Sequence, residues 1–413
     1  MSGIKRWIAI AGAVFLTIAV LAGVFIYHAL QQLRPHSIVT TFRGDPHTSR
    51  AFTWQSPAGD SKAVLQLVKA DGKKSDWSDE RVITVDAQTT VMSDDNGASY
   101  RIHKAEASGL EAGTMYQYRV GDGTKWGWSK TSSFRTEAEH TEAFTFINVT
   151  DSQGETEQHF NIWKDTLDQA FKQFPQAEFI VHNGDFVEYP EDTDAWKLLL
   201  NKANEWITSV PLMPVTGNHE EVKGDAKEFS ARFFVPDNGA SKSNPGTTYS
   251  FQYGSALFIM LNTESNKKEQ TRWLEEQLAA NTKEWIIVSM HKGPYGGKPN
   301  EKIQDWVELF DQYKVDLVLQ GHNHEYARSF PMRNGKVVAN SGEVVSGREG
   351  TVYVVTNAAG AKLNKKKEDQ FYHQVHFQNG EAMFAGITIE GDSLVYSAYN
   401  RSGRLLDRFG LRH

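Results

Sequence analysis

Residues 144–154 read Phe144-Thr-Phe-Ile-Asn-Val-Thr-Asp-Ser-Gln-Gly154, a run of apolar and β-branched residues that ends in Asp151 and Gln153. Such a run predicts a buried strand, and the glycine lets the chain turn sharply after it. Polar side chains that follow a strand directly lie at the carboxyl edge of the sheet, where α/β proteins bind their ligands. The stretch therefore predicts the start of an α/β domain with a ligand site.

Four further predicted strands end in the same kinds of residue. These strands and the residues after them are 178–182 with Asn183-Gly-Asp185, 212–215 with Thr216-Gly-Asn-His-Glu220, 285–290 with His291-Lys-Gly-Pro294, and 315–319 with Gln320-Gly-His-Asn-His-Glu325. The spacing of the first three motifs is about one βαβ unit. We therefore expect Asp, Asn and His side chains to gather at one sheet edge.

The elements between these strands indicate the architecture. Helical patterns lie at 156–174, 270–278 and 302–310, which predicts an α/β fold. Other strand patterns have no helix between them, which predicts mixed, sandwiched sheets. These additional strand patterns lie at 250–253, 256–261, 383–390 and 393–399.

In this order, the five motifs resemble the D-x-[HQ], G-D, G-N-H-[DE], H and G-H-x-H motifs of the calcineurin-like metallophosphoesterases. The resemblance covers residues 144–400. It implies a four-layer α/β metallophosphoesterase domain over 140–400, in which helices flank a mixed β-sandwich, followed by a C-terminal tail at 401–413. Purple acid phosphatases and bacterial phosphohydrolases look like the closest relatives within this superfamily.

Carboxylates, carboxamide oxygens and imidazoles are ligands of Mn, Fe, Zn and Co. The resemblance implies two divalent or trivalent metal ions, iron, manganese or zinc, with Asp185 as the bridge between them. Asp151, Asp185 and His324 would hold the first ion. The second would be held by Asp185, Asn218, His291 and His322. Gln153 stands where ordinary members have histidine, and it is expected either to ligate or to hold a metal-bound water.

The implied reaction is hydrolysis of a phosphomonoester by attack of a metal-bound hydroxide. His219 is the expected general acid, and Glu220 is expected either to orient its ring or to have a capping role. Tyr295 is a candidate for the wall of the substrate cleft. Two alternatives stay open: a phosphodiesterase or nucleotidase on the same site, and a catalytically inactive surface binding protein.

Two positions depart from the purple acid phosphatase pattern. That family has a tyrosine three residues after the bridging aspartate, where this chain has Glu188, and Tyr189 comes one residue later. The first motif, with Gln153, also differs from the D-x-G of purple enzymes. A purple colour and a firm iron requirement are therefore not expected.

Residues 34–137 are predicted to form a separate all-β domain. Leu110-Glu-Ala-Gly-Thr-Met-Tyr-Gln-Tyr-Arg-Val-Gly121 resembles a signature of the fibronectin type III-like domain that precedes the catalytic domain of purple acid phosphatases. Strand candidates at 63–68 and 116–120, separated by turn signals, are typical of a β-sandwich. The expected role is that of a spacer without chemistry of its own, or of a module that binds a carbohydrate or a partner.

The N-terminus and the composition bear on location and partners. Residues 7–27 carry no charged side chain and follow Lys5 and Arg6, which predicts a transmembrane helix within a signal anchor at 1–33. The catalytic domain is then expected on the exported side of the cell membrane, or secreted if the segment is cleaved. The chain has no cysteine, which excludes disulfides and thiolate chemistry, and a net charge of −7 without a basic block argues against a nucleic-acid scaffold.

Overall fold

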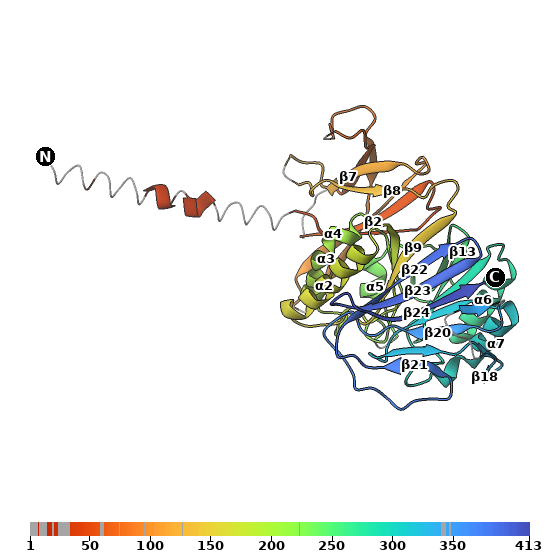
Figure 1. Ribbon diagram of the computed structural model, residues 1–413. Coiled ribbons are helices and arrows are strands. Elements are labelled where there is room, and N and C mark those ends of the chain that lie inside the picture. Colours follow the sequence, from red (N-terminus) through yellow and green to blue (C-terminus); the bar gives the residue numbers. More distant parts are fainter. Residues whose placement is uncertain are drawn as a thin grey trace.

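The computed structural model describes residues 7, 15–18, 20–23, 34–57, 62–73, 75–94, 96–125, 127–222, 224–339, 344–346 and 348–413. Two small sheets lie above two larger sheets and their helices in Figure 1. The predicted β domain and the predicted α/β domain thus both have their counterparts in the structure.

The N-terminal part is a sandwich of two four-stranded sheets, in the orders β1-β2-β6-β5 and β4-β3-β7-β8. Alternating burial along β6 and β7 follows from the period of two in their sequences, which turns every second side chain inward. Phe52, Trp54, Leu65, Tyr118 and Phe134 fill the space between the sheets. The strands are β1 (His36–Thr41), β2 (Ser49–Pro57), β3 (Val64–Lys69), β4 (Ile83–Asp86), β5 (Gln88–Ser93), β6 (Ser99–Ser108), β7 (Met115–Gly121) and β8 (Ser132–Arg135).

Two seven-stranded mixed sheets form the second part of the described chain, in the orders β11-β10-β9-β22-β23-β24-β19 and β12-β13-β14-β15-β20-β16-β21. Strands β9, β10 and β11 run parallel, as do β13, β14, β15 and β20. The first sheet contains β9 (Ala143–Val149), β10 (Ala177–His182), β11 (Leu212–Pro214), β19 (Val344–Ser346), β22 (Met383–Glu390), β23 (Ser393–Asn400) and β24 (Leu405–Arg412). The second contains β12 (Tyr249–Tyr253), β13 (Ala256–Leu261), β14 (Trp285–Met290), β15 (Leu317–Gln320), β16 (Tyr326–Ser329), β20 (Val352–Val355) and β21 (His373–Phe377).

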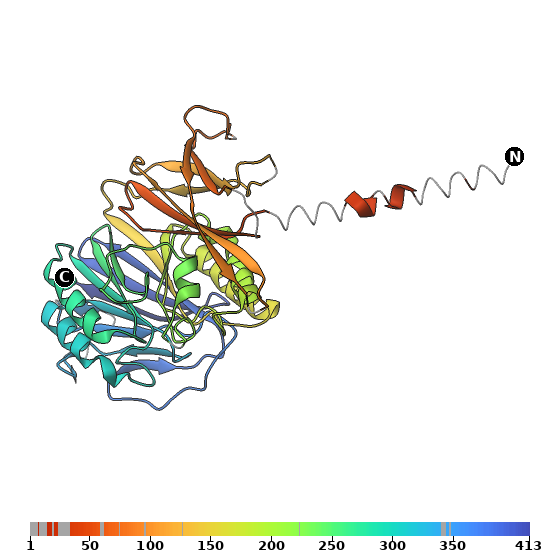
Figure 2. The same ribbon diagram turned by 180° about the vertical axis from the view of Figure 1, so that it is seen from behind.

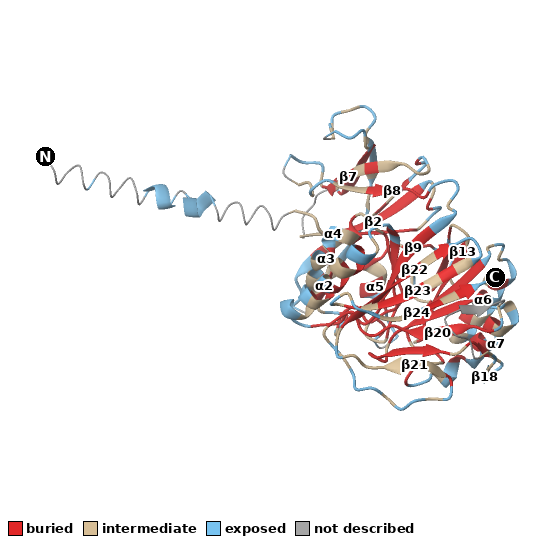
Figure 3. Cartoon of the chain, in the orientation of Figure 1, coloured by how far each residue is buried: buried red, intermediate tan, exposed pale blue. Residues whose placement is uncertain are grey.

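Helices cover the outer faces of the two sheets, with α2, α3 and α4 on one side and α6 and α7 on the other (Figure 1). Figure 3 shows buried strands between helices whose outer surfaces are exposed. The helices are α2 (Glu157–Gln173), α3 (Thr193–Lys202), α4 (Asn204–Ile207), α5 (Lys227–Arg232), α6 (Lys267–Ala279), α7 (Gln304–Tyr313) and the 3₁₀ turn η1 (Glu301–Ile303). A short hairpin, β17 (Met332–Arg333) with β18 (Lys336–Val337), completes the fold.

Aromatic side chains form the core between the large sheets. Phe146 stacks on Phe179 with ring centroids 5.2 Å apart, and Phe258 packs edge-on against Phe179 at 5.2 Å. Phe42, from the chain segment after β1, joins the same cluster at 5.7 Å from Phe179. Figure 2 shows the N-terminal strands lying against the helical side, where Thr40 donates a hydrogen bond to the Ile207 carbonyl. The sandwich is therefore packed onto the α/β part.

One component of the predicted fold class is wrong. Among the residues that the structure describes, no helix is long and apolar enough to cross a membrane, which overturns the transmembrane helix expected over 7–27. The rest of that segment lies outside the described residues. The expected export of the α/β domain is not tested by this finding and stays a prediction.

Most strands and helices of the α/β domain lie where the sequence pattern predicts them, within a few residues. The predicted C-terminal tail differs, because β24 lies within it and pairs with both β23 and β19. The sequence of β24 alternates apolar and polar residues only briefly, so the pattern alone does not predict a strand. Hydrogen bonding to the neighbouring strands stabilises it as one.

Candidate metal centre

The motif residues come together because their strands are parallel neighbours. Asp151, Asp185 and Asn218 follow β9, β10 and β11, which are adjacent in the first sheet. His291 and the pair His322 and His324 follow β14 and β15, which are adjacent in the second. The carboxyl ends of both sets meet at one edge of the two packed sheets, as expected for an α/β ligand site.

Four of these residues have a left-handed backbone. The φ angles are 52° at Asp151, 58° at Asp185, 74° at His322 and 52° at His324. For a residue with a side chain this conformation costs about 1–2 kcal/mol. The sharp turn that it makes directs each side chain back over the strand ends. Strain of this kind clusters at functional sites because the surrounding fold holds it in place.

Close packing of the backbone leaves room only for glycine at two motif positions. A Cβ atom on Gly217 would lie 2.1 Å from Asp185 Oδ1, and one on Gly321 would lie 2.1 Å from the Thr150 hydroxyl. The glycines of the G-N-H and G-H-x-H motifs therefore let the ligand-bearing loops approach one another.

The side chains form two groups that share Asp185. In the first group, Asp151, Asp185 and His324 each offer a ligand atom within 4.8 Å of the others, and His324 Nε2 lies 3.1 Å from Asp151 Oδ1. In the second, Asp185, His291 and His322 do the same, and His291 Nε2 lies 3.0 Å from Asp185 Oδ2. A carboxylate common to both groups is what a bridged pair of cations requires.

Unpaired buried atoms test whether the donor set suits metal ions. Asn218 Oδ1 and Gln153 Oε1 are both buried without a hydrogen-bond partner. An unsatisfied buried polar atom is costly, and a cation would satisfy both oxygens. Oxygen and imidazole donors are also the chemistry that Mn, Fe and Zn prefer. The residues present therefore fit a dinuclear centre.

Charge in the site favours a cation as well. Burial alone would raise the pKa of Asp185, but His291 and His219 hold it below its ordinary value. Burial opposes protonation of His291, yet Asp185 and Asp151 raise the pKa of its ring to about 10. The carboxylates thus create a strong demand for positive charge, and metal ions compete with protons for such groups.

Backbone carbonyls fix the orientation of three imidazoles. Nδ1 of His291 lies 2.8 Å from the Asn183 carbonyl, and Nδ1 of His324 lies 2.5 Å from the Lys362 carbonyl. A proton on Nδ1 leaves the Nε2 lone pair free to face the carboxylates, as in many metal sites. Spacing patterns alone cannot identify these carbonyls, because any residue can supply one.

His219 is held in the same way beside the shared carboxylate. Its Nδ1 lies 2.7 Å from the Glu188 carbonyl, and its Nε2 lies 3.9 Å from Asp185 Oδ2. The side chain is 21% exposed, so a substrate can reach it from solvent. Its backbone N–H also donates to Asp185 Oδ1 at 3.0 Å.

Glu220 does not orient the His219 ring. Its Oε2 accepts the N–H groups of Asp185 and Gly217 at 2.8 and 2.9 Å, and its Oε1 accepts that of Phe186 at 2.7 Å. Burial, and then the Asp185 carboxylate, raise the pKa of Glu220 to about 8. Glu220 thus fixes the backbone of Asp185. This resembles the expected capping role more than the expected orientation of the His219 ring.

Glu188, at the position of the family tyrosine, pairs with Lys362, whose Nζ lies 2.9 and 3.0 Å from its two carboxylate oxygens. The backbone carbonyl of Glu188 holds the ring of His219, and that of Lys362 holds the ring of His324. The ion pair therefore links the two segments that orient these histidines. Tyr295, in contrast, packs against Tyr353 and Tyr372 with centroids 4.7 and 5.1 Å away.

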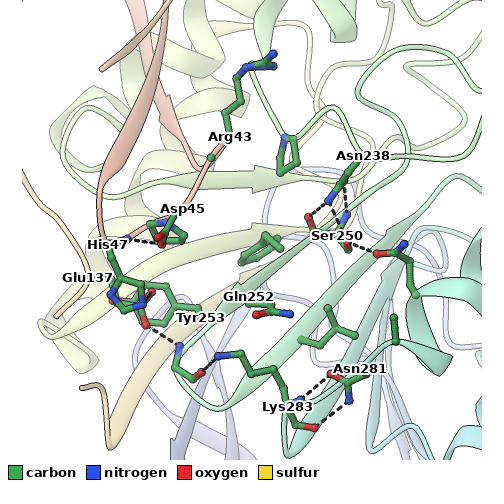
Figure 4. Close-up of a pocket in the computed structure, with 18 residues that line it drawn as sticks. Arg43, Asp45, His47, Glu137, Asn238, Ser250, Gln252, Tyr253, Asn281 and Lys283 are labelled. Atoms are coloured by element: carbon green, nitrogen blue, oxygen red, sulfur yellow. Dashed lines mark hydrogen bonds and ion pairs between the residues drawn. The ribbon is translucent and has the colours of Figure 1, made fainter. Parts of the chain in front are cut away.

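A cavity of about 520 Å³ lies elsewhere, between the sandwich and the α/β part (Figure 4). Arg43, Asp45, Glu137 and Lys283 are among the polar side chains that line it. None of the predicted site residues borders this cavity, so the hollow and the ligand cluster are separate features.

Comparisons with protein families match both parts of the chain. Residues 35–136 match the purple acid phosphatase N-terminal domain, and residues 144–326 match the calcineurin-like phosphoesterase family.

Similar proteins come from several kingdoms. An uncharacterized protein of Mycobacterium tuberculosis is 31% identical over 36% of this chain and 35% of its own length. Human acid phosphatase type 7 is 27% identical over 63% of this chain and 64% of its own length. Probable inactive purple acid phosphatase 27 of Arabidopsis thaliana is 25% identical over 64% of this chain and 50% of its own length. The chain thus spans between about a third and two thirds of these relatives.

A solved structure shares the fold over most of the chain. The purple acid phosphatase PPD1 from yellow lupin (Lupinus luteus) seeds superposes with a TM-score of 0.79 at 19% identity, covering 92% of this chain and 74% of that one. At this identity the likeness concerns the fold.

Proposed function

Because this chain belongs to the calcineurin-like metallophosphoesterases, with a purple acid phosphatase-type domain in front, we propose that it is a dinuclear-metal-dependent phosphatase acting on phosphomonoesters. The observation that carries the proposal is the pair of ligand groups that share Asp185. This chain has a metal-ligating residue type at each of the positions named above, which favours an active enzyme although two similar proteins are named as inactive.

Each cation would have its own set of protein ligands around the shared carboxylate. Asp151, Asp185 and His324 would hold one ion, with Gln153 Oε1 beside it. The other ion would be held by Asp185, Asn218, His291 and His322. Two bound cations lower the pKa of a water molecule and offset negative charge on a phosphoryl group.

The protein's own contribution to bond cleavage is a proton at the leaving group. The Glu188 carbonyl holds Nδ1 of His219, so Nε2 points toward the shared carboxylate and toward substrate. From there a protonated ring can donate to the leaving alkoxide oxygen, which makes that oxygen a better leaving group.

The test removes the metals and returns them. The full chain is dialysed against a chelator, supplied with Mn, Fe or Zn, and assayed with p-nitrophenyl phosphate and with bis(p-nitrophenyl) phosphate. We expect metal-dependent turnover that favours the monoester. A preference for the diester would support a phosphodiesterase on the same site. If no metal restores turnover of either ester, the proposal that this chain is a metal-dependent phosphoesterase is contradicted.

A further inference from the structure

A second group of metal-ligand side chains lies at the edge strand β21, on residues that the proposed dinuclear centre does not use. Asp369, His373 and His376 each offer a ligand atom, and these atoms lie within 4.8 Å of one another. Strand β21 lies at the outer end of the second sheet (Figure 1). The group is therefore a separate feature of the fold.

A β-bulge brings the two histidines together. Residues three apart on a regular strand point to opposite faces. Here Arg328 pairs with Val375 but the next residue, Ser329, pairs with His373, so the register slips by one residue at Gln374. The bulge turns His373 toward the face of His376, and their ring centroids lie 4.0 Å apart. Bulges commonly redirect a side chain in this way.

His376 lies between two carboxylates. Its Nδ1 is 2.7 Å from Asp369 Oδ1, and its Nε2 is 3.3 Å from Glu325 Oε2. The His376 side chain is 2% exposed and that of Glu325 is fully buried. His376 Nε2 and Glu325 Oε1 nevertheless have no hydrogen-bond partner. Lys367 Nζ lies 3.6 Å from Glu325 Oε1.

His373 makes two contacts with the backbone. Its ring contacts the Gln370 N–H at 3.1 Å and the Gly296 carbonyl at 3.3 Å, both at the long end of the hydrogen-bond range. Either contact can give way to an ion.

We propose that Asp369, His373 and His376 bind one Zn²⁺-class ion, with Glu325 holding the ring of His376. Two imidazoles and a carboxylate suit zinc or a neighbouring transition metal better than Ca²⁺ or Mg²⁺, which prefer oxygen alone. Ligand atoms around one tetrahedral zinc ion lie about 3.4 Å apart, so small side-chain shifts suffice. Lys366, whose Nζ lies 2.5 Å from Asp369 Oδ1, would give up that contact to the ion.

The ion would restrain a segment that also serves the dinuclear centre. The loop between β20 and β21 carries Asp369 near its end and Lys362 near its middle, and the Lys362 carbonyl holds Nδ1 of His324. Linking Asp369 to the histidines of β21 anchors this loop to the sheet. The site is thus structural, and it does not depend on the proposed phosphatase activity.

Zinc content measures the site directly. The full chain and its variants are loaded with Zn²⁺, freed of excess metal by gel filtration, and analysed for zinc per chain. We expect Asp185→Asn to retain one ion and Asp185→Asn with His373→Gln to retain none. Zinc should raise the melting temperature of the first variant and leave that of the second unchanged. His140→Gln, an exposed substitution, should have the content of the wild type.

Equal zinc content with and without His373→Gln would overturn the proposal, and His376 would then only form ion pairs with Asp369 and Glu325. If Asp185→Asn does not fold, the wild type is compared with His373→Gln alone, where the loss of one ion is expected. Phosphatase assays are not part of this readout, so its outcome is independent of the proposed function.

Discussion

At the residue scale, the site depends on which ring nitrogen each histidine presents. His219, His291 and His324 all have Nδ1 against a backbone carbonyl, which leaves Nε2 for the reacting centre. The same arrangement therefore gives a proton donor in one case and metal ligands in the others. What differs is the surroundings, since His291 is fully buried and His219 is partly exposed.

His219→Gln tests the proton donor. A general acid contributes about 10²–10⁴-fold to rate, and its contribution depends on how basic the leaving group is. We expect kcat for an alkyl phosphate to fall within that range and kcat for p-nitrophenyl phosphate to fall much less, because nitrophenolate leaves without a proton. Steady-state kinetics with both esters measures the ratio. Equal losses for the two substrates would indicate a role in binding or structure.

The candidate ligands could be found from sequence because each one directly follows a recognisable strand. Asp151, Asp185 and Asn218 come together because the strands that they follow are parallel neighbours in one sheet. Glu220 was also a candidate, although its contacts with three backbone N–H groups were not predicted. The Glu188 and Lys362 carbonyls that orient His219 and His324 could not be found in this way, because residue type carries no signal for a backbone carbonyl.

At the scale of elements, β24 is the strand next to the edge of the first sheet, between β23 and β19. Its Phe409 and Leu411 belong to the main core, although its sequence reads as a chain terminus. It pairs with β23, which precedes it across a short turn at 401–404, and with β19, which lies far away in the sequence. Local pattern therefore predicts helices and inner strands better than a terminal strand whose stability comes from tertiary contacts.

Phe409→Ala tests whether β24 is part of the core. Phe409 stacks on Tyr396 with centroids 5.0 Å apart, and truncating a buried phenylalanine costs about 3–5 kcal/mol. Leu405→Ala, on the same strand but 45% exposed, should change the free energy of unfolding by much less. Urea unfolding of both variants compares them. A small effect of Phe409→Ala would mean that the segment does not support the sheet.

Strand β6 of the sandwich carries a pH-sensitive group. His103 contacts the Ser56 and Thr89 hydroxyls at 2.7 and 2.9 Å, and burial, then Arg101, lower its pKa from 6.5 to about 4. The folded state therefore prefers the neutral ring. The neutral ring therefore contributes to the free energy of unfolding in full above pH 6.5. This contribution, up to about 3 kcal/mol, is lost as the pH falls from 6.5 toward 4.

His103→Gln isolates that contribution. Between pH 6.5 and pH 4.5, the melting temperature of the variant should fall by less than that of the wild type, as measured by circular dichroism. His140→Gln, at an exposed position, should behave as the wild type. Parallel pH profiles for wild type and His103→Gln would contradict the assignment to His103.

At the scale of the whole molecule, the sandwich and the α/β part share an extensive interface. Tyr100 donates to Glu228 Oε2 at 2.8 Å, Tyr118 to the Thr208 carbonyl at 2.7 Å, and Lys104 to the Phe233 carbonyl at 3.0 Å. All three come from the sandwich and end on the α/β part. The N-terminal domain thus acts at least as a fixed support for the fold that carries the metal centre.

The central claim is that one carboxylate, Asp185, joins two metal sites into a phosphatase centre. The most direct measurement is metal content per chain, with p-nitrophenyl phosphate turnover, for wild type and Asp185→Asn prepared in parallel. We expect this single substitution to remove two ions and the metal-dependent turnover together. Retention of both ions, or undiminished turnover, in a folded Asp185→Asn protein would contradict it.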